Sequence, residues 1–166
     1  MGIEKEMSFY GTIYSEGCPG CNRVEPQPDG LSIIFENDYF RVHQDYALPI
    51  PGMMVIESKR HVSRIYEFTP NELNSFSITL QMTREAMRLA GIEEATLVQE
   101  EKSSHFHAWW LPILPWMKDI TNGKLRNIQE IFDHAKEVTT LPPITEVEEV
   151  VKKIKEYFEK NNEREV

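Results

Sequence analysis

The sequence predicts an α+β fold, in which a long helix covers an antiparallel sheet of about five strands and further helices follow at the C-terminal end. Three observations lead to this prediction. Two β-prone runs flank the hairpin signal Glu36-Asn37-Asp38. A capping box opens a long amphipathic helix at Thr69. The run from His105 to Pro112 then has the character of a strand that leaves a polar loop.

Five strands are expected, and they lie in two groups on either side of the long helix. The first group is a hairpin followed by a strand after the break at Pro49, Pro51 and Gly52. The second group contains a short apolar run and the histidine strand. In chain order the expected strands are 31–35, 40–46, 53–57, 95–100 and 105–112.

The long helix has clear start and stop signals. Thr69 and Glu72 form the capping box, Pro70 occupies the first helical position, and Gly91 ends a run of about six turns. Apolar residues repeat inside it at helical spacing, which is more typical of a core face than of a ligand site. The repeating positions are Leu73, Phe76, Leu80 and Met87.

Two more helices are expected after Trp116. One has an apolar stripe within 125–135, and the other, capped by Thr145 and Glu148, has a stripe within 147–158. Leu-Pro-Pro at 141–143 separates them. We therefore divide the chain into a domain at 1–117 and a helical extension at 118–166, which packs on the same domain or on a dimer partner.

Composition excludes several classes of function. The chain has 166 residues and a formal net charge of −9, which argues against a broad surface for nucleic acid or anionic membranes. A small phosphate ligand in a locally positive pocket remains compatible with that charge. Neither a membrane-spanning apolar run nor the apolar core of a signal peptide is present. We expect a cytoplasmic protein in a reducing compartment, where its two cysteines stay reduced.

The motif Cys18-Pro19-Gly20-Cys21 allows three interpretations. A thioredoxin-type redox pair requires a helix directly after the motif, but Pro26 and Pro28 follow and disfavour one. Two inert loop cysteines are a second interpretation. A zinc knuckle is the third, because C-x2-C supplies half of a tetrahedral site and needs two further ligands from elsewhere in the chain.

The histidine strand places chemically active side chains together. Because successive strand residues point to opposite faces, His105, His107 and Trp109 are expected on one face. Two interpretations remain open from the residues alone. The imidazoles are either satisfied, half-buried histidines in an aromatic strand or members of a reactive site.

These motifs, in this order, resemble the histidine triad (HIT) superfamily of nucleotidyl hydrolases and transferases. The resemblance covers about residues 18–116 and rests on C-x2-C, on IIFENDYFRVHQDYALPIPGMMVIESKRH, and on HFHAWWLP. The late motif of that family alternates three histidines with apolar residues. Here His105 and His107 match its first two positions, and Trp109 stands at the third.

The resemblance implies a zinc site. In zinc-bearing members two histidines complete the C-x2-C pair, one after the third strand and one at the start of the late motif. Carried over, the ligands are Cys18, Cys21, His61 and His105. Thiolates and neutral imidazoles suit zinc, and four protein ligands leave no open position, so the implied metal is structural.

The resemblance also implies that His107 is a nucleophile. In the family the middle histidine attacks the α-phosphorus of a nucleotide and forms a covalent nucleotidyl-histidine, which water or another acceptor resolves. Splitting one displacement into two easier steps is the general benefit of covalent catalysis. A homodimer is likewise implied by the resemblance alone.

The resemblance also identifies candidate nucleotide-binding residues by their positions in the sequence. The resemblance places Asp45 where an acidic residue bonds the ribose hydroxyls, and Ile34 and Phe35 where apolar residues line the base pocket. The alternatives are a strand-end turn for Asp45 and plain core for the other two. Polar residues before or within the late motif are candidates for holding the phosphate, with a solvated loop as the alternative: Gln99, Lys102, Ser103, Ser104 and Trp109. The Gly-Gln-Ser pattern usual before that motif is absent.

Trp109 is the main departure from the family pattern. The indole has one N–H donor and no proton that titrates near neutral pH, so it holds a phosphate oxygen but protonates no leaving group. Two classes of function therefore stay open. One is a HIT-type nucleotidyl hydrolase or transferase, and the other is a nucleotide-binding or regulatory module with little or no turnover. A redox protein built on Cys18 and Cys21 is a third, weaker alternative.

Overall fold

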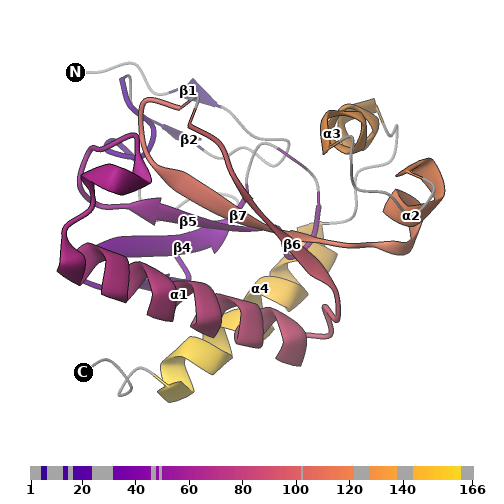
Figure 1. Cartoon of the computed structure of the whole chain (residues 1–166). Coiled ribbons are helices and arrows are strands. Elements are labelled where there is room, and N and C mark those ends of the chain that lie inside the picture. The colour runs from indigo at the N-terminus through magenta and orange to yellow at the C-terminus, as the bar shows by residue number, and fades with distance from the viewer. Residues whose placement is uncertain are drawn as a thin grey trace.

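The computed structural model describes residues 5–6, 13–14, 17–23, 32–45, 48, 50–101, 103–121, 128–137 and 144–161. Its main element is a five-stranded antiparallel sheet in the order β3-β4-β5-β7-β6, which confirms the predicted fold class (Figure 1). The strands are β3 (Phe35–Glu36), β4 (Phe40–Gln44), β5 (Met54–Ser58), β6 (Ala95–Gln99) and β7 (His107–Pro112).

The predicted hairpin forms around Asn37. Its side-chain Oδ1 accepts hydrogen bonds from the backbone N–H groups of Tyr39 at 2.9 Å and Phe40 at 2.8 Å, as Asn residues commonly do in turns. The strand before it is shorter than predicted, since β3 covers only Phe35–Glu36. Residue 31 of the predicted run lies outside the described residues.

The long helix α1 (Pro70–Leu89) confirms the predicted capping box. Thr69 Oγ1 accepts from the Glu72 backbone N–H at 3.2 Å, and the Glu72 carboxylate accepts from the Thr69 N–H at 2.7 Å. Gly91 has a φ of +98° directly after the helix, a conformation that side chains disfavour. Both ends of the helix are therefore encoded locally.

One face of the sheet forms the main hydrophobic core under α1 and α4 (Ile144–Asn161). α4 adds its own apolar stripe to this core, and Phe158 stacks on Phe35 with ring centroids 4.4 Å apart. Figure 1 shows the two helices crossing on this side of the sheet. The buried sheet residues are Phe40, Val42, Met54, Ile56 and Ala108.

The opposite face divides into an apolar part and a polar part. A second hydrophobic cluster joins α2 (Pro115–Thr121) and α3 (Ile128–Glu137) to Met53, Val98 and Leu111. α2 and α3 lie together, away from α1, in Figure 1. The remainder of this face carries charged and histidine side chains, which form the candidate site described below.

Other local features also differ from the sequence predictions, including the start of α4 at Ile144, which places the predicted cap Thr145 inside the helix. α2 was not predicted, because seven residues are too few for an amphipathic period to show. β1 (Lys5–Glu6) and β2 (Ile13–Tyr14) form a separate two-stranded sheet. β7 begins at His107, two residues later than expected, so His105 precedes the strand. No helix within the described ranges is both long and apolar enough to cross a bilayer.

Candidate functional site

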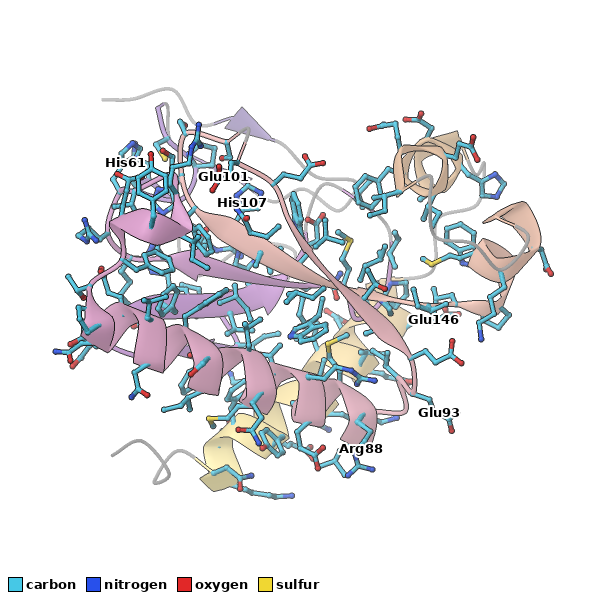
Figure 2. All side chains as sticks on the ribbon, in the orientation of Figure 1. His61, Arg88, Glu93, Glu101, His107 and Glu146 are labelled. Atoms are coloured by element: carbon cyan, nitrogen blue, oxygen red, sulfur yellow. The ribbon has the colours of Figure 1, made fainter. Side chains whose placement is uncertain are left out.

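Four side chains of types that bind metal ions converge at one end of the sheet. The donor atoms of Cys18, Cys21, His61 and His105 all lie within 4.8 Å of one another. Figure 2 shows His61 and His107 at this end of the molecule, remote from Arg88 and Glu93 near the far end of α1. The structure thus brings together all four residues that the sequence singled out as ligands.

The distances in this cluster suit a single tetrahedral ion. Sγ of Cys18 lies 3.3 Å from Nδ1 of His105, and Sγ of Cys21 lies 3.2 Å from Nδ1 of His61. The two Nδ1 atoms are 3.3 Å apart. Zinc bonds of about 2.3 Å to sulfur and about 2.0 Å to nitrogen give tetrahedral edges of roughly 3.3 Å between nitrogens, 3.5 Å between nitrogen and sulfur, and 3.8 Å between sulfurs.

A tight turn presents the two thiols. The Cys18 carbonyl accepts hydrogen bonds from the N–H groups of Cys21 at 3.1 Å and Asn22 at 2.9 Å. Gly20 lies so close to the histidine that an added Cβ would sit 2.8 Å from the His105 ring. Arg41 donates to the Gly20 carbonyl at 3.0 Å and ties the turn to β4. The turn therefore needs a residue without a side chain at position 20.

Backbone hydrogen bonds just outside the ends of β5 and β7 position His61 and His105. The Phe106 N–H donates to the Val62 carbonyl at 2.6 Å, and the Ser58 N–H donates to the Phe106 carbonyl at 3.2 Å. Nε2 of His105 lies 2.6 Å from the Ser58 carbonyl oxygen. Because a carbonyl only accepts, Nε2 carries the proton, and Nδ1 presents its lone pair to the thiols.

The donor set fits a divalent zinc ion. Burial raises the pKa of the Cys21 thiol, and the neighbouring Cys18 raises it further, by more than the positive charge of Arg41 lowers it. A dication at the centre of the cluster supplies further positive charge and favours both thiolates. Two thiolates and two imidazoles are a common zinc ligand set.

His107 lies beside this cluster with its ring in the opposite tautomer. Nδ1 of His107 is 3.0 Å from the His105 carbonyl oxygen, so Nδ1 carries the proton and Nε2 keeps its lone pair. On the neighbouring strand Glu57 stands directly opposite His107. Trp109 contacts the imidazole edge-to-face, with ring centroids 4.4 Å apart. A neutral imidazole held in this way has the lone pair that a nucleophile requires.

A cavity of about 210 Å³ opens in front of His107. Its lining includes Asp45, Ser103, Ser104 and Trp109, four other residues that the sequence identified as candidates for nucleotide binding. Asp45 also has a local role, because its Oδ1 accepts from the Leu48 N–H at 2.9 Å. The cavity therefore brings together an imidazole, two hydroxyls and a carboxylate.

The remaining candidates lie elsewhere. Ile34 and Phe35 line a separate groove, and the stacking of Phe35 on Phe158 makes its ring part of the core. Gln99 pairs with Ala108 across β6 and β7, so it lies on the face opposite His107. Lys102 is outside the described residues.

Three charged side chains near the cavity were missed by the sequence analysis: Arg41, His43 and Glu57. His43 is only 1% exposed and Glu57 only 7%. Oε2 of Glu57 lies 3.6 Å from Nε2 of His43, and Oε1 lies 3.7 Å from Nη1 of Arg41. The alternation Phe40, Arg41, Val42, His43 was the available signal, since it gives β4 one apolar and one polar face.

The charge state of Glu57 reflects this cluster. Burial alone raises the pKa of the Glu57 carboxyl, but the close approach of the His43 ring and the charges of His43, Arg23 and Arg41 outweigh burial. Together they hold the pKa of Glu57 below its ordinary value. Glu57 is therefore a carboxylate at neutral pH.

A larger open groove, about 600 Å³, lies between the β3–β4 turn and α1. It is lined by Lys59, acidic residues and amides, and it contains neither histidine nor cysteine. His107 and part of the Cys2His2 cluster, Cys18 and His105, lie at the smaller cavity instead. We therefore take the smaller cavity as the candidate active site.

Comparison with known proteins supports the fold assignment. No family model matches the sequence, and no curated protein is significantly similar to it. A HIT-like protein of Bartonella henselae involved in cell-cycle regulation has a similar structure, with a TM-score of 0.54 and 17% identity over 75% of this chain and 85% of that one.

Two further solved structures are comparable. Plasmodium falciparum diadenosine triphosphate hydrolase gives a TM-score of 0.55 at 11% identity, over 96% of this chain and 87% of the hydrolase. A hypothetical histidine triad nucleotide-binding protein of Sulfolobus tokodaii gives 0.51 at 14% identity, over 78% of this chain and 85% of that one. The chain has the histidine triad fold.

Proposed function

We propose that this protein is a histidine triad nucleotidyl hydrolase or transferase that acts at the α-phosphate of a nucleotide through a covalent intermediate on His107. The observation that supports this proposal most directly is the orientation of the His107 ring. Its Nδ1–H is committed to the His105 carbonyl at 3.0 Å, which leaves the Nε2 lone pair for the cavity that His107 lines. The candidate substrates are nucleoside phosphoramidates, dinucleoside polyphosphates and sugar nucleotides.

The other cavity residues have roles that fit this chemistry. The Ser103 and Ser104 hydroxyls, with nearby backbone amides, hold non-bridging phosphate oxygens and stabilise the charge that develops on them. Asp45, which lines the cavity, accepts hydrogen bonds from the ribose hydroxyls. Trp109 packs against the reactive ring and restricts its rotation.

In the same proposal Cys18, Cys21, His61 and His105 hold a structural zinc. Four protein ligands leave no position for substrate, so the ion stabilises the N-terminal turn against the sheet and takes no part in the chemistry. A reducing cytoplasm would keep both thiols available for the metal. The resemblance also implies a homodimer, which light scattering on the purified protein would test.

The direct test is intact-protein mass spectrometry after brief reaction with a panel of the three substrate classes, quenched without acid. We expect a nucleotidyl mass increase that peptide mapping locates on His107. An adduct on any other residue, or turnover that survives His107→Ala, would remove His107 from the mechanism.

A nucleotide-binding module without turnover is the second candidate. Trp109 favours it, since an indole at this position supplies no proton to a leaving group. Measurable nucleotide affinity with neither adduct nor hydrolysis across the whole panel would establish this alternative.

A further inference from the structure

We propose that Pro19 and Gly20 form a wall shared by the Cys2His2 cluster and the nucleotide cavity, so that zinc and nucleotide strengthen each other's binding. Arg41 is the residue that positions this shared wall. The inference rests on the proposed function, because it takes the cavity at His107 as the nucleotide site. It adds an energetic link between two sites that bind different ligands.

The turn between the two thiols is part of the cavity lining. Cys18, Pro19 and Gly20 line the cavity together with His105 and His107. Cys18 and His105 also belong to the Cys2His2 cluster. The shared wall therefore faces a nucleotide on one side, and its position depends on the metal ligands on the other side.

Close packing ties the shared wall to the cluster. Gly20 is buried, and a Cβ built on it would lie 2.8 Å from the His105 ring. Sγ of Cys18 lies 3.3 Å and Sγ of Cys21 3.5 Å from Nδ1 of the same ring. Because protein interiors are close-packed, a shift of the turn must be taken up by the groups that touch it. A displaced turn would therefore change the geometry of the ligands and the shape of the cavity together.

Arg41 holds the shared wall from the side of the sheet. Its Nη1 donates to the Gly20 carbonyl at 3.0 Å. Carboxylates hold the guanidinium in turn, since Oε1 of Glu57 lies 3.7 Å from Nη1 and Oε2 of Glu36 lies 3.6 Å from Nε. Groups that orient metal ligands from outside typically change metal affinity about 10- to 100-fold when they are removed. Arg41 acts through Gly20, so it is a positioning residue.

The coupling arises from the cost of ordering the turn. A dication bound to Cys18 and Cys21 would fix both ends of the segment that contains the shared wall. A nucleotide then meets a wall that is already ordered, and it does not bear that entropic cost again. By thermodynamic linkage, the nucleotide must raise the affinity for zinc by the same factor. Couplings between sites are typically about 5- to 150-fold.

The first test uses the parent protein and adenosine 5′-monophosphate, which has no leaving group to lose. Chelator competition measures the zinc affinity with and without saturating nucleotide. Calorimetry measures the nucleotide affinity of the zinc-loaded and the metal-free protein, at a temperature where circular dichroism shows that both are folded. We expect each ligand to tighten the binding of the other about tenfold, with equal factors in the two directions.

The second test uses zinc-loaded variants and also decides the question if the metal-free protein unfolds. Arg41→Gln removes the cation that holds Gly20, and Arg41→Lys keeps a cation at that position. With the p-nitrophenyl ester of adenosine 5′-monophosphate, we expect Arg41→Gln to raise KM about tenfold and to leave kcat within about twofold of the parent. Its zinc affinity should fall by about tenfold or more. Arg41→Lys should recover most of both losses.

Arg84→Gln is the matched control. Nη1 of Arg84 likewise donates to a backbone carbonyl, that of Ile92 at 3.1 Å, but Figure 2 shows the next residue, Glu93, far from His61 and His107. This variant loses a similar hydrogen bond remote from both sites. We expect it to keep the zinc affinity, KM and kcat of the parent, even if its melting temperature falls.

The outcomes separate this inference from the proposed function. A zinc affinity that the nucleotide leaves unchanged, or a parent-like KM in Arg41→Gln, would overturn the shared wall while leaving the His107 mechanism intact. Equal losses in Arg41→Gln and Arg84→Gln would also overturn it, because they would reflect global stability. A parent protein that forms no adduct and binds no nucleotide would overturn the proposed function and this inference together.

Discussion

His105 and His107 are two residues apart, yet their rings face different surroundings and present different nitrogens. His105 gives its Nε2–H to the Ser58 carbonyl at 2.6 Å and turns Nδ1 toward two thiols and His61. His107 gives its Nδ1–H to the His105 carbonyl at 3.0 Å and keeps the Nε2 lone pair. In each case a backbone carbonyl selects the tautomer.

This difference is the basis for the two roles that we propose within one short motif. His105 precedes β7, where the chain still turns and its ring reaches the loop cysteines. His107 is the first residue of β7, so its direction is set by the pleat of the sheet and by the facing Glu57. The boundary of the strand therefore lies between the histidine of the Cys2His2 cluster and the histidine that we propose as the nucleophile.

The largest effect is expected from replacing His107, the proposed nucleophile, alone. His107→Asn should lower turnover by more than about 1,000-fold, as removal of a nucleophile does in other enzymes, because no other side chain forms the covalent intermediate. Zinc content and the melting temperature should stay within error of the parent, since His107 is not one of the four clustered ligands. Steady-state kinetics, metal analysis and thermal melts check the three parts. A loss of zinc in this variant would show that the two histidines are not independent.

Replacing one of the proposed metal ligands should have the opposite effect: it should lower stability and leave the reaction at His107 intact. Cys18→Ser is expected to lose stoichiometric zinc and several kcal/mol of unfolding free energy, because metal binding is coupled to folding. The nucleophile should still accept a nucleotidyl group at low temperature. Metal analysis, chemical denaturation and adduct mass spectrometry on the same preparation measure these effects. Equal zinc binding by variant and parent would refute the four-ligand cluster.

A smaller change tests the close fit around His105. In Gly20→Ala the new Cβ would lie 2.8 Å from the His105 ring, so the turn or the ring must move. We expect a loss of about 1–3 kcal/mol in unfolding free energy, typical of overpacking, together with weaker zinc binding. Competition with a chelator measures the zinc affinity. Parent-like affinity would mean that the turn adjusts without cost.

The smallest effect concerns the loop that carries His61. Hydrogen bonds from Arg60, at 2.8 Å to each oxygen, hold the pKa of Glu72 well below its ordinary value, at about 2. The folded-state pKa is lowered, so the stabilisation is present above the unfolded pKa of about 4.3 and is lost as pH falls toward about 2. Glu72→Gln should cost about 1–2 kcal/mol at neutral pH, since Arg60 is half exposed and solvent screens the pair.

Denaturation of metal-free protein across this pH range is the appropriate measurement, because acid also releases zinc from thiolates. The parent should lose stability between about pH 4.5 and about pH 2, and Glu72→Gln should lose correspondingly less. Identical pH profiles for the two proteins would show that the Arg60–Glu72 pair contributes nothing to the stability of this loop.

Most of the sheet and the long helix were predictable because their signals are local. The capping box at Thr69, the turn at Asn37 and the stop at Gly91 each act within a few residues. α2 escaped detection because it has only seven residues. The start of β7 could not be located from local signals either. Phe106, the residue before the strand, is hydrogen-bonded to Val62, which lies 44 residues earlier in the chain.

The candidate site was predictable only in part, for a similar reason. The order of the motifs along the chain pointed to His107 and to the cysteines. The register between paired strands, however, decides which side chains lie on the same face of the sheet. Gln99 faces away from the cavity because it pairs with Ala108, whereas His43 and Glu57 face it because their strands pair as they do. Pairing between strands that are distant in sequence is not visible in either strand alone.

The tautomers of the two motif histidines can be read directly from long-range ¹H–¹⁵N NMR spectra of the zinc-loaded protein with labelled histidine. We expect His105 to carry its proton on Nε2, with Nδ1 shifted as a metal-bound nitrogen, and His107 to carry its proton on Nδ1 with a free Nε2. Two histidines in the same tautomer, or an Nε2 of His107 bound to the metal, would contradict the separation of structural and chemical roles along this strand.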